Sequence, residues 1–286
     1  MEAGMASNNA LIAVKNRGWL NGFGNIFRKE NHAWWGTWQW VIQIAIWMTI
    51  VNGMMAMVTL AAPKIEEAQS RQEINEVEAA AARDALKQTA LTVFFVFSGL
   101  APAVGVVIIA QDALIGEKQS GTAAWVLSKP VSRTAFLLSK LTADGLGVLV
   151  TMVLVQGIAA YFIYKAGTGI TLPIPGFLAA LGLVMLVLLF YLSLTYMLGT
   201  LFRKRGAVIG IPMVLVFSNQ LVGLAPWLGR VMPWNLVMDL GPDQPSLAVA
   251  LAQSQPLPTV TPIIGTILLT IVFIGVALWR FGREEF

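Results

Sequence analysis

The sequence predicts an all-α integral membrane protein with six transmembrane helices. Only 12% of its 286 residues are charged and 57% are hydrophobic, whereas a soluble domain carries roughly 25% charged residues. Mean hydropathy is correspondingly high, at +0.71. As α-helices, six stretches are long enough to cross the roughly 30 Å hydrocarbon core of a bilayer. These stretches contain no Asp, Glu, Lys, Arg or His and cover residues 37–60, 89–111, 145–164, 177–202, 206–229 and 259–279.

The distribution of basic residues predicts the orientation of these helices. Six spans put both termini on one side, and 13 of the 19 Lys and Arg residues fall on that side. Because basic residues accumulate on the cytoplasmic side of membrane proteins, we expect both termini inside the cell. Trp34, Trp35, Trp38 and Trp40 gather at one interface of the first span, as in an aromatic belt. We therefore expect a multi-pass protein of the cell membrane.

The segment before the first span predicts a helix that lies on the membrane surface. Residues 1–21 are expected to be a flexible cytoplasmic N-terminus, and residues 22–36 mix apolar and basic side chains as an amphipathic helix does. Its basic residues are placed to contact anionic membrane lipids. The six-span membrane domain then extends over residues 37–280 and a cytoplasmic tail over 281–286.

Two outer segments differ in composition from the spans. Residues 64–88 are rich in Glu and Ala, which predicts a mostly solvated helix; a docking surface for an extracytoplasmic partner is the alternative. Residues 230–258 contain many prolines, so we expect only short interfacial helices, at 236–240 and 246–253. A loop that rests on the outer leaflet is the simpler interpretation of 230–258, and a gate is the alternative.

Residues 112–133 form a polar segment between the second and third predicted spans. A short helix is expected after Gly121, with Ser120 or Thr122 near its cap, and Pro130 disfavours its continuation. Ser132 is placed to cap the next helix, on which Lys140 and Asp144 are four residues apart and could pair. A stiff element of this kind between two long helices could transmit a push to both of them.

This segment resembles the coupling region of ABC-2 type exporter permeases, which are the transmembrane subunits of ABC transporters. The resemblance rests on Glu117, Gly121, Thr122, Leu127, Ser128, Pro130, Val131, Ser132, Arg133 and Lys140. The sequence Arg28-Lys29-Glu30 before the first span, in the position of an elbow helix, and the six-span plan support it. An ordinary capped cytoplasmic hairpin would explain the cap and the proline but not the whole pattern.

The resemblance implies a partner and an energy source. Residues 112–133 would dock on a cytosolic ABC ATPase, and two permease copies, expected as a homodimer, would join two ATPase subunits. The residues implied at the ATPase interface are Glu117, Gly121, Thr122, Ser128, Pro130, Ser132 and Arg133. ATP and Mg would bind on the ATPase subunit.

Several kinds of site are not predicted in this chain. It has no cysteine and no G-x-x-x-x-G-K-[ST] motif, so we expect neither thiolate metal sites nor a nucleotide cradle. The predicted spans contain no carboxylate for ion coupling, and Asp112 and Asp144 are interpreted as interfacial. Scattered basic residues argue against nucleic acid as a partner. We expect a non-enzymatic subunit with no catalytic, cofactor-binding or metal site.

Uncharged polar residues within the spans are candidates for a translocation path. They are Asn52, Gln156, Ser193, Thr195, Asn219 and Gln220. Such side chains also hydrogen-bond one helix to another, which is the alternative role. The basic turn at 203–205 is interpreted as a topology anchor, with a contact to the ATPase as the alternative.

The sequence thus predicts the transmembrane subunit of an ATP-driven exporter. The uncharged span interiors favour an amphipathic, lipid-like or hydrophobic peptide or drug cargo. Two alternatives remain: a non-transporting scaffold or assembly factor that binds an external partner through 64–88, and a carrier driven by an ion gradient.

Overall fold

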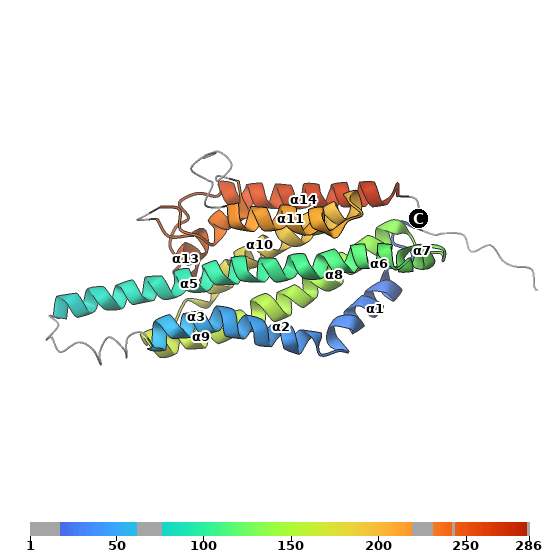
Figure 1. The fold of residues 1–286 in the computed structure, drawn as a ribbon. Helices are drawn as coiled ribbons and strands as arrows, with labels where there is room; N and C mark the ends of the chain where they lie inside the picture. Colours follow the sequence, from blue (N-terminus) through green and yellow to red (C-terminus); the bar gives the residue numbers. More distant parts are fainter. Residues whose placement is uncertain (1–17, 62–75, 219–230, 242–243, 285–286) are drawn as a thin grey trace, which may run out of the picture.

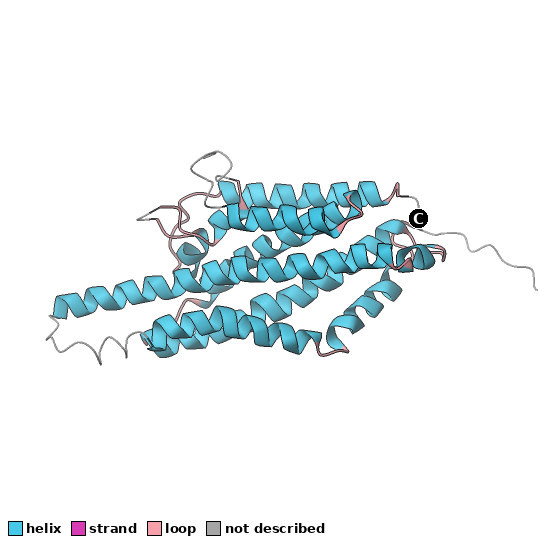
Figure 2. Cartoon of the chain, viewed as in Figure 1, coloured by secondary structure: helices cyan, strands magenta, loops and turns pink. Residues whose placement is uncertain are grey.

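The computed structural model describes residues 18–61, 76–218, 231–241 and 244–284. In these ranges the chain folds as an elongated bundle of long helices joined by short loops (Figures 1 and 2). One end of the bundle holds α1 (Phe23–Trp35), α7 (Thr122–Leu127) and the last turn of α14 (Thr261–Phe281). We call it the α7 end. Of the predicted N-terminal segment 1–21, residues 1–17 lie outside the described residues, and so do residues 64–75 of the predicted outer insertion 64–88.

Five helices of the described chain are long and apolar enough to cross a membrane. They are Gln39–Ala61, Asp84–Gln119, Arg133–Thr168, Ile174–Leu201 and Thr261–Phe281. A shorter apolar helix, α11 (Arg205–Phe217), covers the first half of the fifth predicted span. The rest of that segment lies almost entirely outside the described residues. Five membrane-spanning helices are therefore found in the described chain, and the fifth predicted span, 206–229, is not confirmed.

The first spanning helix contains two π-helical segments. It consists of α2 (Gln39–Trp47), η1 (Met48–Asn52), α3 (Gly53–Ala56) and η2 (Met57–Ala61). The third contains one, between α8 (Arg133–Val148) and α9 (Val155–Thr168), named η4 (Leu149–Leu154). π-Helical segments widen a helix locally and are frequent near functional sites.

The second and third spanning helices extend well beyond the predicted apolar stretches. The second runs through α5 (Glu76–Gln111), η3 (Asp112–Gly116) and α6 (Glu117–Gln119). Each helix has 36 residues in its spanning range, which corresponds to about 54 Å at the α-helical rise. For the third helix, the start after Ser132 and the course through Lys140 and Asp144 were expected, and both are confirmed. The end of the second span at residue 111 was wrong, because the charged side chains of Asp112 and Glu117 have partners on neighbouring helices and do not end the helix.

Helix α10 (Ile174–Leu201) is the centre of the bundle. It packs against α5, α13 (Leu247–Ala252) and α14, and most of its side chains, including Phe190, Tyr191 and Tyr196, are buried. Helices at the periphery instead expose aliphatic side chains such as Ile46 on α2 and Ile271 on α14. Since lipid is as apolar as these side chains, close packing rather than water exclusion holds such helices together.

Small residues allow the closest helix contacts. Trp47 of the first span lies directly over Gly105 of α5, and the Trp34 ring of α1 lies over Gly147 of α8, so that a Cβ at either glycine would collide with a ring. Glycine at a helix interface lets two backbones approach closely. The glycine at 147 therefore determines how closely α1 can approach α8.

At the end opposite α7, two elements of the segment 231–258 pack into the protein interior. A loop resting on the outer leaflet was expected there. A 3-10 turn, η6 (Pro233–Leu236), replaces the predicted helix at 236–240, and α13 lies within the predicted 246–253. Both elements are buried and pack against α10, and α13 also packs against α5. These contacts bury their apolar side chains. Ser246 caps α13 by accepting a hydrogen bond from the Val249 N–H at 3.2 Å.

Substituting Gly147 tests the contact between α1 and α8. Gly147→Ala should lower the unfolding temperature in detergent micelles, because overpacking a tight contact costs about 1–3 kcal/mol. Gly145→Ala is the matched control, since its Cβ would have its nearest neighbour at 3.9 Å and alanine favours helix. Equal unfolding temperatures for the two variants in thermal fluorescence scans would contradict the packing described.

Candidate functional site

Asp144 joins three helices at the α7 end. Its Oδ1 accepts a hydrogen bond from Trp34 Nε1 at 2.9 Å, and its Oδ2 accepts one from the Tyr196 hydroxyl at 2.6 Å. Trp34 is on α1, Asp144 on α8 and Tyr196 on α10, and all three are buried. The sequence indicates an interfacial carboxylate here and leaves a pair with Lys140 open. Instead, it lies between helices and its hydrogen-bond donors are neutral.

Lys140 pairs with two glutamates from different segments. Its Nζ lies 3.0 Å from Glu30 Oε1 on α1 and 3.0 Å from Glu117 Oε1 on α6. Lys29 Nζ lies 3.3 Å from each of the same two oxygens. We call Lys29, Glu30, Glu117 and Lys140 the four-residue ion-pair network. It ties α1, the end of the second spanning helix and α8 together.

Burial makes this network different from surface ion pairs. The Lys140 side chain is 2% exposed, and the Glu30 and Glu117 side chains are 16% and 17% exposed. Exposed pairs contribute about 0–1 kcal/mol. Removing one partner of a buried pair costs about 3–5 kcal/mol, because the remaining charge stays buried without compensation.

Lys29 lies at the solvent-facing side of the network. Burial acts to lower the pKa of Lys29, but the adjacent Glu30 and Glu117 carboxylates outweigh it and raise this pKa above the ordinary 10.5. A lysine with a raised pKa contributes stability at neutral pH and loses it only as the pH rises through that value. The Lys29 ion pairs are therefore present throughout the physiological range.

A second pairing holds the segment that follows α14. Lys118 Nζ lies 2.7 Å from Glu284 Oε2 and donates a hydrogen bond to the Gly199 carbonyl at 2.9 Å. Arg133 Nη1 donates to the Gly282 carbonyl at 2.9 Å. These contacts connect α6 and α8 with the ends of α10 and α14.

Residues 120–132 form a short projection beyond these pairings. Gly121 adopts a left-handed conformation (φ 73°) and is the N-cap of α7, so Ser120 and Thr122 lie beside the cap as predicted, although no side chain makes a capping hydrogen bond. Trp125 is 64% exposed, and Lys129 Nζ lies 3.6 Å from the centre of its ring. The projection therefore presents an aromatic side chain and a cation to its surroundings.

The projection is fixed at its base. Asn21 Nδ2 donates to the Pro130 carbonyl at 2.7 Å, and the Ser132 N–H donates to the Asn21 carbonyl at 3.0 Å. Ser132 Oγ caps α8 as predicted, accepting from the Ala135 N–H at 3.0 Å. The segment before α1 and the segment after α7 are thus held against one another.

The structure divides the seven residues proposed for a partner interface into two groups. Glu117, Pro130, Ser132 and Arg133 make the internal contacts described above. Gly121 and Ser128 are exposed, and Thr122 is partly exposed on α7. The internal group supports the projection, and the second group shares its outer surface with Trp125.

Two of the proposed path residues contact each other across helices. Asn52, at the end of η1, donates from Nδ2 to Gln156 Oε1 at 2.8 Å, and both are buried. Gln156 Nε2 donates to the Thr151 carbonyl in η4 at 2.9 Å. The amide of Gln156 thereby supplies a partner to a carbonyl in the π-helical segment. These contacts favour the helix-linking alternative for Asn52 and Gln156.

The other proposed path residues are satisfied within one helix or lie outside the described residues. Ser193 Oγ donates to the Phe190 carbonyl at 3.0 Å, and Thr195 Oγ1 donates to the Tyr191 carbonyl at 2.7 Å. Both are buried on α10. Asn219 and Gln220 lie outside the described residues.

Sequence reasoning missed several residues that organise this region. Tyr196 had no assigned role. Trp34 was assigned only to an aromatic belt, Glu30 only to the elbow sequence, and Trp125 only to a short helix. An available signal was the position of Lys140 and Asp144 in an otherwise apolar helix, since buried charges require partners. Arg205 of the basic turn pairs with Asp112 at 2.9 Å, in an exposed contact. In the described chain no group of three or more His, Asp or Glu side chains could hold a metal ion.

Comparison with known proteins gives one family. The sequence profile described as "ABC-2 family transporter protein" matches residues 25–286. The match includes nearly all of α1 and every spanning helix described above. No curated protein shows a significant match.

Lys140→Met tests the four-residue ion-pair network. The substitution should lower the free energy of unfolding by roughly 3 kcal/mol, because two carboxylates then share only the half-exposed Lys29. Denaturant titration in micelles measures this change. Lys129→Met, which removes an exposed cation–π contact, should cost at most about 1 kcal/mol.

A compensating variant separates charge from packing. Adding Glu30→Gln and Glu117→Gln to Lys140→Met should restore most of the lost stability, since no charge of the Lys140 pairs is then left uncompensated. Similar losses for Lys140→Met and Lys129→Met, or no recovery in the triple variant, would show that the network does not hold the helices together.

Proposed function

Since the chain belongs to the ABC-2 transporter family, we propose that it is the transmembrane subunit of an ATP-driven exporter, with α7 receiving the stroke of a separate ATPase. The chain is a multi-pass protein of the plasma membrane, as its family and its five long apolar helices indicate. Members of the family are generally non-catalytic membrane subunits that work with a cytosolic ABC ATPase.

The observation that carries the proposal is the exposed surface of α7. Trp125 projects from the end of the bundle, with Lys129 over its ring and Thr122 one turn before it. Large aromatic side chains at protein surfaces are typical anchors of an interface. A groove on the ATPase subunit would take this side chain, and the positive-inside rule would put α7 in the cytoplasm.

The contacts at the base of the projection support transmission of force. The four-residue ion-pair network connects α6 with α1 and α8. Lys118 and Arg133 add contacts to the ends of α10 and α14. A push on α7 would therefore move the ends of several spanning helices as one unit instead of bending a loop.

The complete transporter would contain two copies of this chain and two ATPase subunits. ATP and Mg would bind on the ATPase subunits, whose closure would move the α7 segments and open a path between the two copies. The uncharged, apolar spans favour an amphipathic or lipid-like cargo. Basic residues of α1, such as Arg28, would contact anionic lipid at the inner leaflet.

A second candidate function is a scaffold that binds an external partner. It is favoured by the start of α5 at Glu76, since this helix extends past its neighbours at the end opposite α7 (Figure 1). Deleting residues 64–83 separates the two functions. A scaffold would lose its partner, whereas an exporter would keep its coupling to the ATPase.

Trp125→Ala tests the proposed ATPase contact. The chain is co-expressed with a cytosolic ABC ATPase from the same organism, and the ATPase retained on purification is measured. Loss of an aromatic anchor typically costs 2 kcal/mol or more, so retention should fall at least about tenfold. Trp38→Ala is the matched control, because Trp38 is 76% exposed but lies between α1 and α2.

Transport is measured with the same complexes in liposomes. Trp125→Ala should abolish ATP-driven transport while Trp38→Ala keeps it. Full ATPase retention and transport by the Trp125 variant would remove the proposal, as would transport driven by an ion gradient without ATP.

A further inference from the structure

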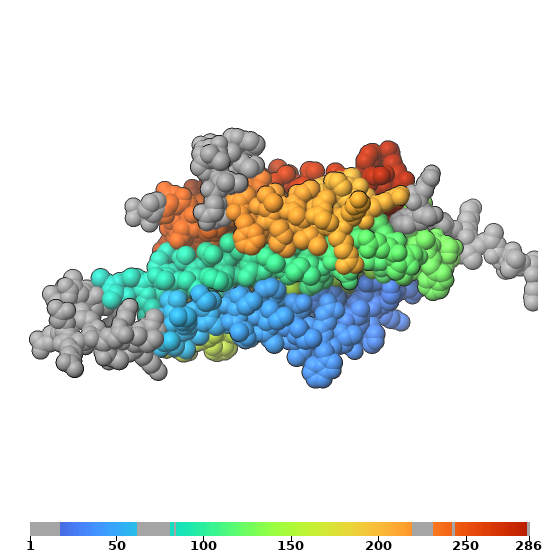
Figure 3. Space-filling model, viewed as in Figure 1, coloured from blue at the N-terminus to red at the C-terminus, as the bar shows by residue number. Residues whose placement is uncertain are grey.

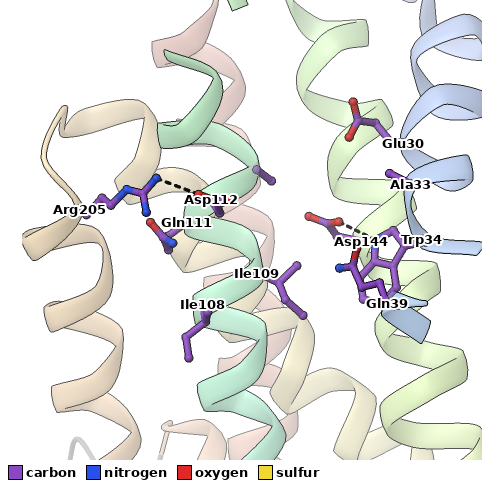
Figure 4. Close-up of a pocket in the computed structure, with 11 residues that line it drawn as sticks. Glu30, Ala33, Trp34, Gln39, Ile108, Ile109, Gln111, Asp112, Asp144 and Arg205 are labelled. Atoms are coloured by element: carbon purple, nitrogen blue, oxygen red, sulfur yellow. Dashed lines mark hydrogen bonds and ion pairs between the residues drawn. The ribbon is translucent and has the colours of Figure 1, made fainter. Parts of the chain in front are cut away.

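A cavity of about 490 Å³ opens at the α7 end between two groups of helices. Gln111, Asp112 and Arg205 lie on one side, on α5, η3 and α11. Glu30, Trp34 and Asp144 face them from α1 and α8 (Figure 4). Ile108 and Ile109 line it from α5, within about one turn before Gln111 and Asp112. The cavity is therefore acidic at its walls and apolar toward the middle of the bundle.

Asp144 is the one carboxylate of this lining, among the described residues, without a cationic partner. Asp112 pairs with Arg205, and Glu30 pairs with Lys29 and Lys140. The Asp144 oxygens accept hydrogen bonds only from the neutral Trp34 and Tyr196 groups. Each oxygen of the Asp144 carboxylate can accept a further hydrogen bond. A buried carboxylate with neutral partners favours a cation placed beside it.

Gln111 gives an independent indication of a ligand. Its side chain is 6% exposed, it lines the same cavity, and its Oε1 has no hydrogen-bond partner. A buried acceptor without a donor is unfavourable, and such groups call for an explanation. The cavity thus offers an amide oxygen and a carboxylate from opposite walls, which suits a ligand that carries N–H donors and a positive charge.

A second cavity, of about 420 Å³, continues along the same helices and is apolar. It is lined by Trp47, Ile50, Phe97, Leu100, Val104 and Phe217. Both cavities lie between the first span, the second span and α11, and Figure 3 shows α5 exposed between α2 and α11 on this face. Along α5, Leu100 and Gln111 are about 16 Å apart at the helical rise, which is comparable to an extended dodecyl chain.

We propose that these two cavities form one binding track for a single-chain cationic amphiphile, with an ammonium head at Asp144 and Gln111 and the alkyl chain against Leu100 and Val104. An anionic head at this place would lie beside Asp144, which has no cationic partner among the described residues, and is disfavoured. One part of this proposal rests on the proposed function, namely that the bound amphiphile is cargo. Under the orientation proposed above, the head lies at the cytoplasmic interface and the chain points into the bilayer.

Binding is tested with a dodecylammonium brominated at the end of its chain, added to the protein in phosphatidylcholine nanodiscs. Bromine should quench the fluorescence of Trp47 saturably, and Trp47→Phe should remove that component. A brominated dodecyl sulfate with the same chain should not quench saturably. Equal binding of the two head groups would overturn the assignment of the head-group site.

Two variants separate binding from folding. Gln111→Leu removes a buried acceptor without a partner, so it should keep or raise the unfolding temperature and yet weaken dodecylammonium binding about tenfold. Asp144→Asn should weaken dodecylammonium binding at least as much, while a brominated dodecanol still binds to this variant. Leu178→Ala, in a separate apolar cavity between α9 and α10, should change nothing. Unchanged dodecylammonium binding by Gln111→Leu would overturn the proposal.

The assay needs no ATPase, so its result is independent of the proposed function. If dodecylammonium binds saturably but no ATPase associates with the chain, the binding track stands and the proposed exporter function is removed. Coupling to an ATPase without saturable binding would do the reverse. Stimulation of ATP hydrolysis by dodecylammonium, lost in Gln111→Leu, would support the amphiphile as cargo.

Discussion

The bond on which the α7 end depends is the sharing of Lys140 between Glu30 and Glu117. A lysine that is 2% exposed loses several kcal/mol of hydration, and only the paired carboxylates at 3.0 Å offset that loss. The three residues come from segments far apart in the sequence. Neither α1 nor the end of the second spanning helix can move away from α8 without leaving a buried charge uncompensated. Their positions are therefore mutually fixed.

Asp144 extends this constraint toward the membrane interior. Through Trp34 and Tyr196 it links α1 and α8 to the central helix α10. One turn of α8 separates Asp144 from Lys140, so the hydrogen bonds and the ion pairs act on the same two helices. The exposed α7 is consequently attached to a rigid base. This rigidity is the property that a segment needs if it is to transmit motion from a partner to the spanning helices.

The middle of the bundle is built differently from its α7 end. Asn52 and Gln156 join the first and third spans next to the π-helical segments η1 and η4. Interhelical hydrogen bonds in membranes average only about 0.6 kcal/mol, so this link is weaker than the ion pairs. The apolar cavity beside α5 also lies in this middle part, between the first span, the second span and α11. A stiff end and a more adaptable middle therefore coexist within one bundle.

The sequence by itself determined the helical class, five of the six predicted spans and part of the remaining one, the presence of a helix before them, and the Ser132 cap. Each follows from local composition or from a side chain that bonds its own neighbours. It did not determine how far the second helix extends past residue 111, the burial of 247–252, or the partners of Lys140 and Asp144. Only the tertiary structure decides these, because a helix continues past a charged residue only where a neighbouring helix offers that charge a partner. Glu30 and Glu117 are 110 and 23 residues from Lys140, and no local pattern encodes that meeting.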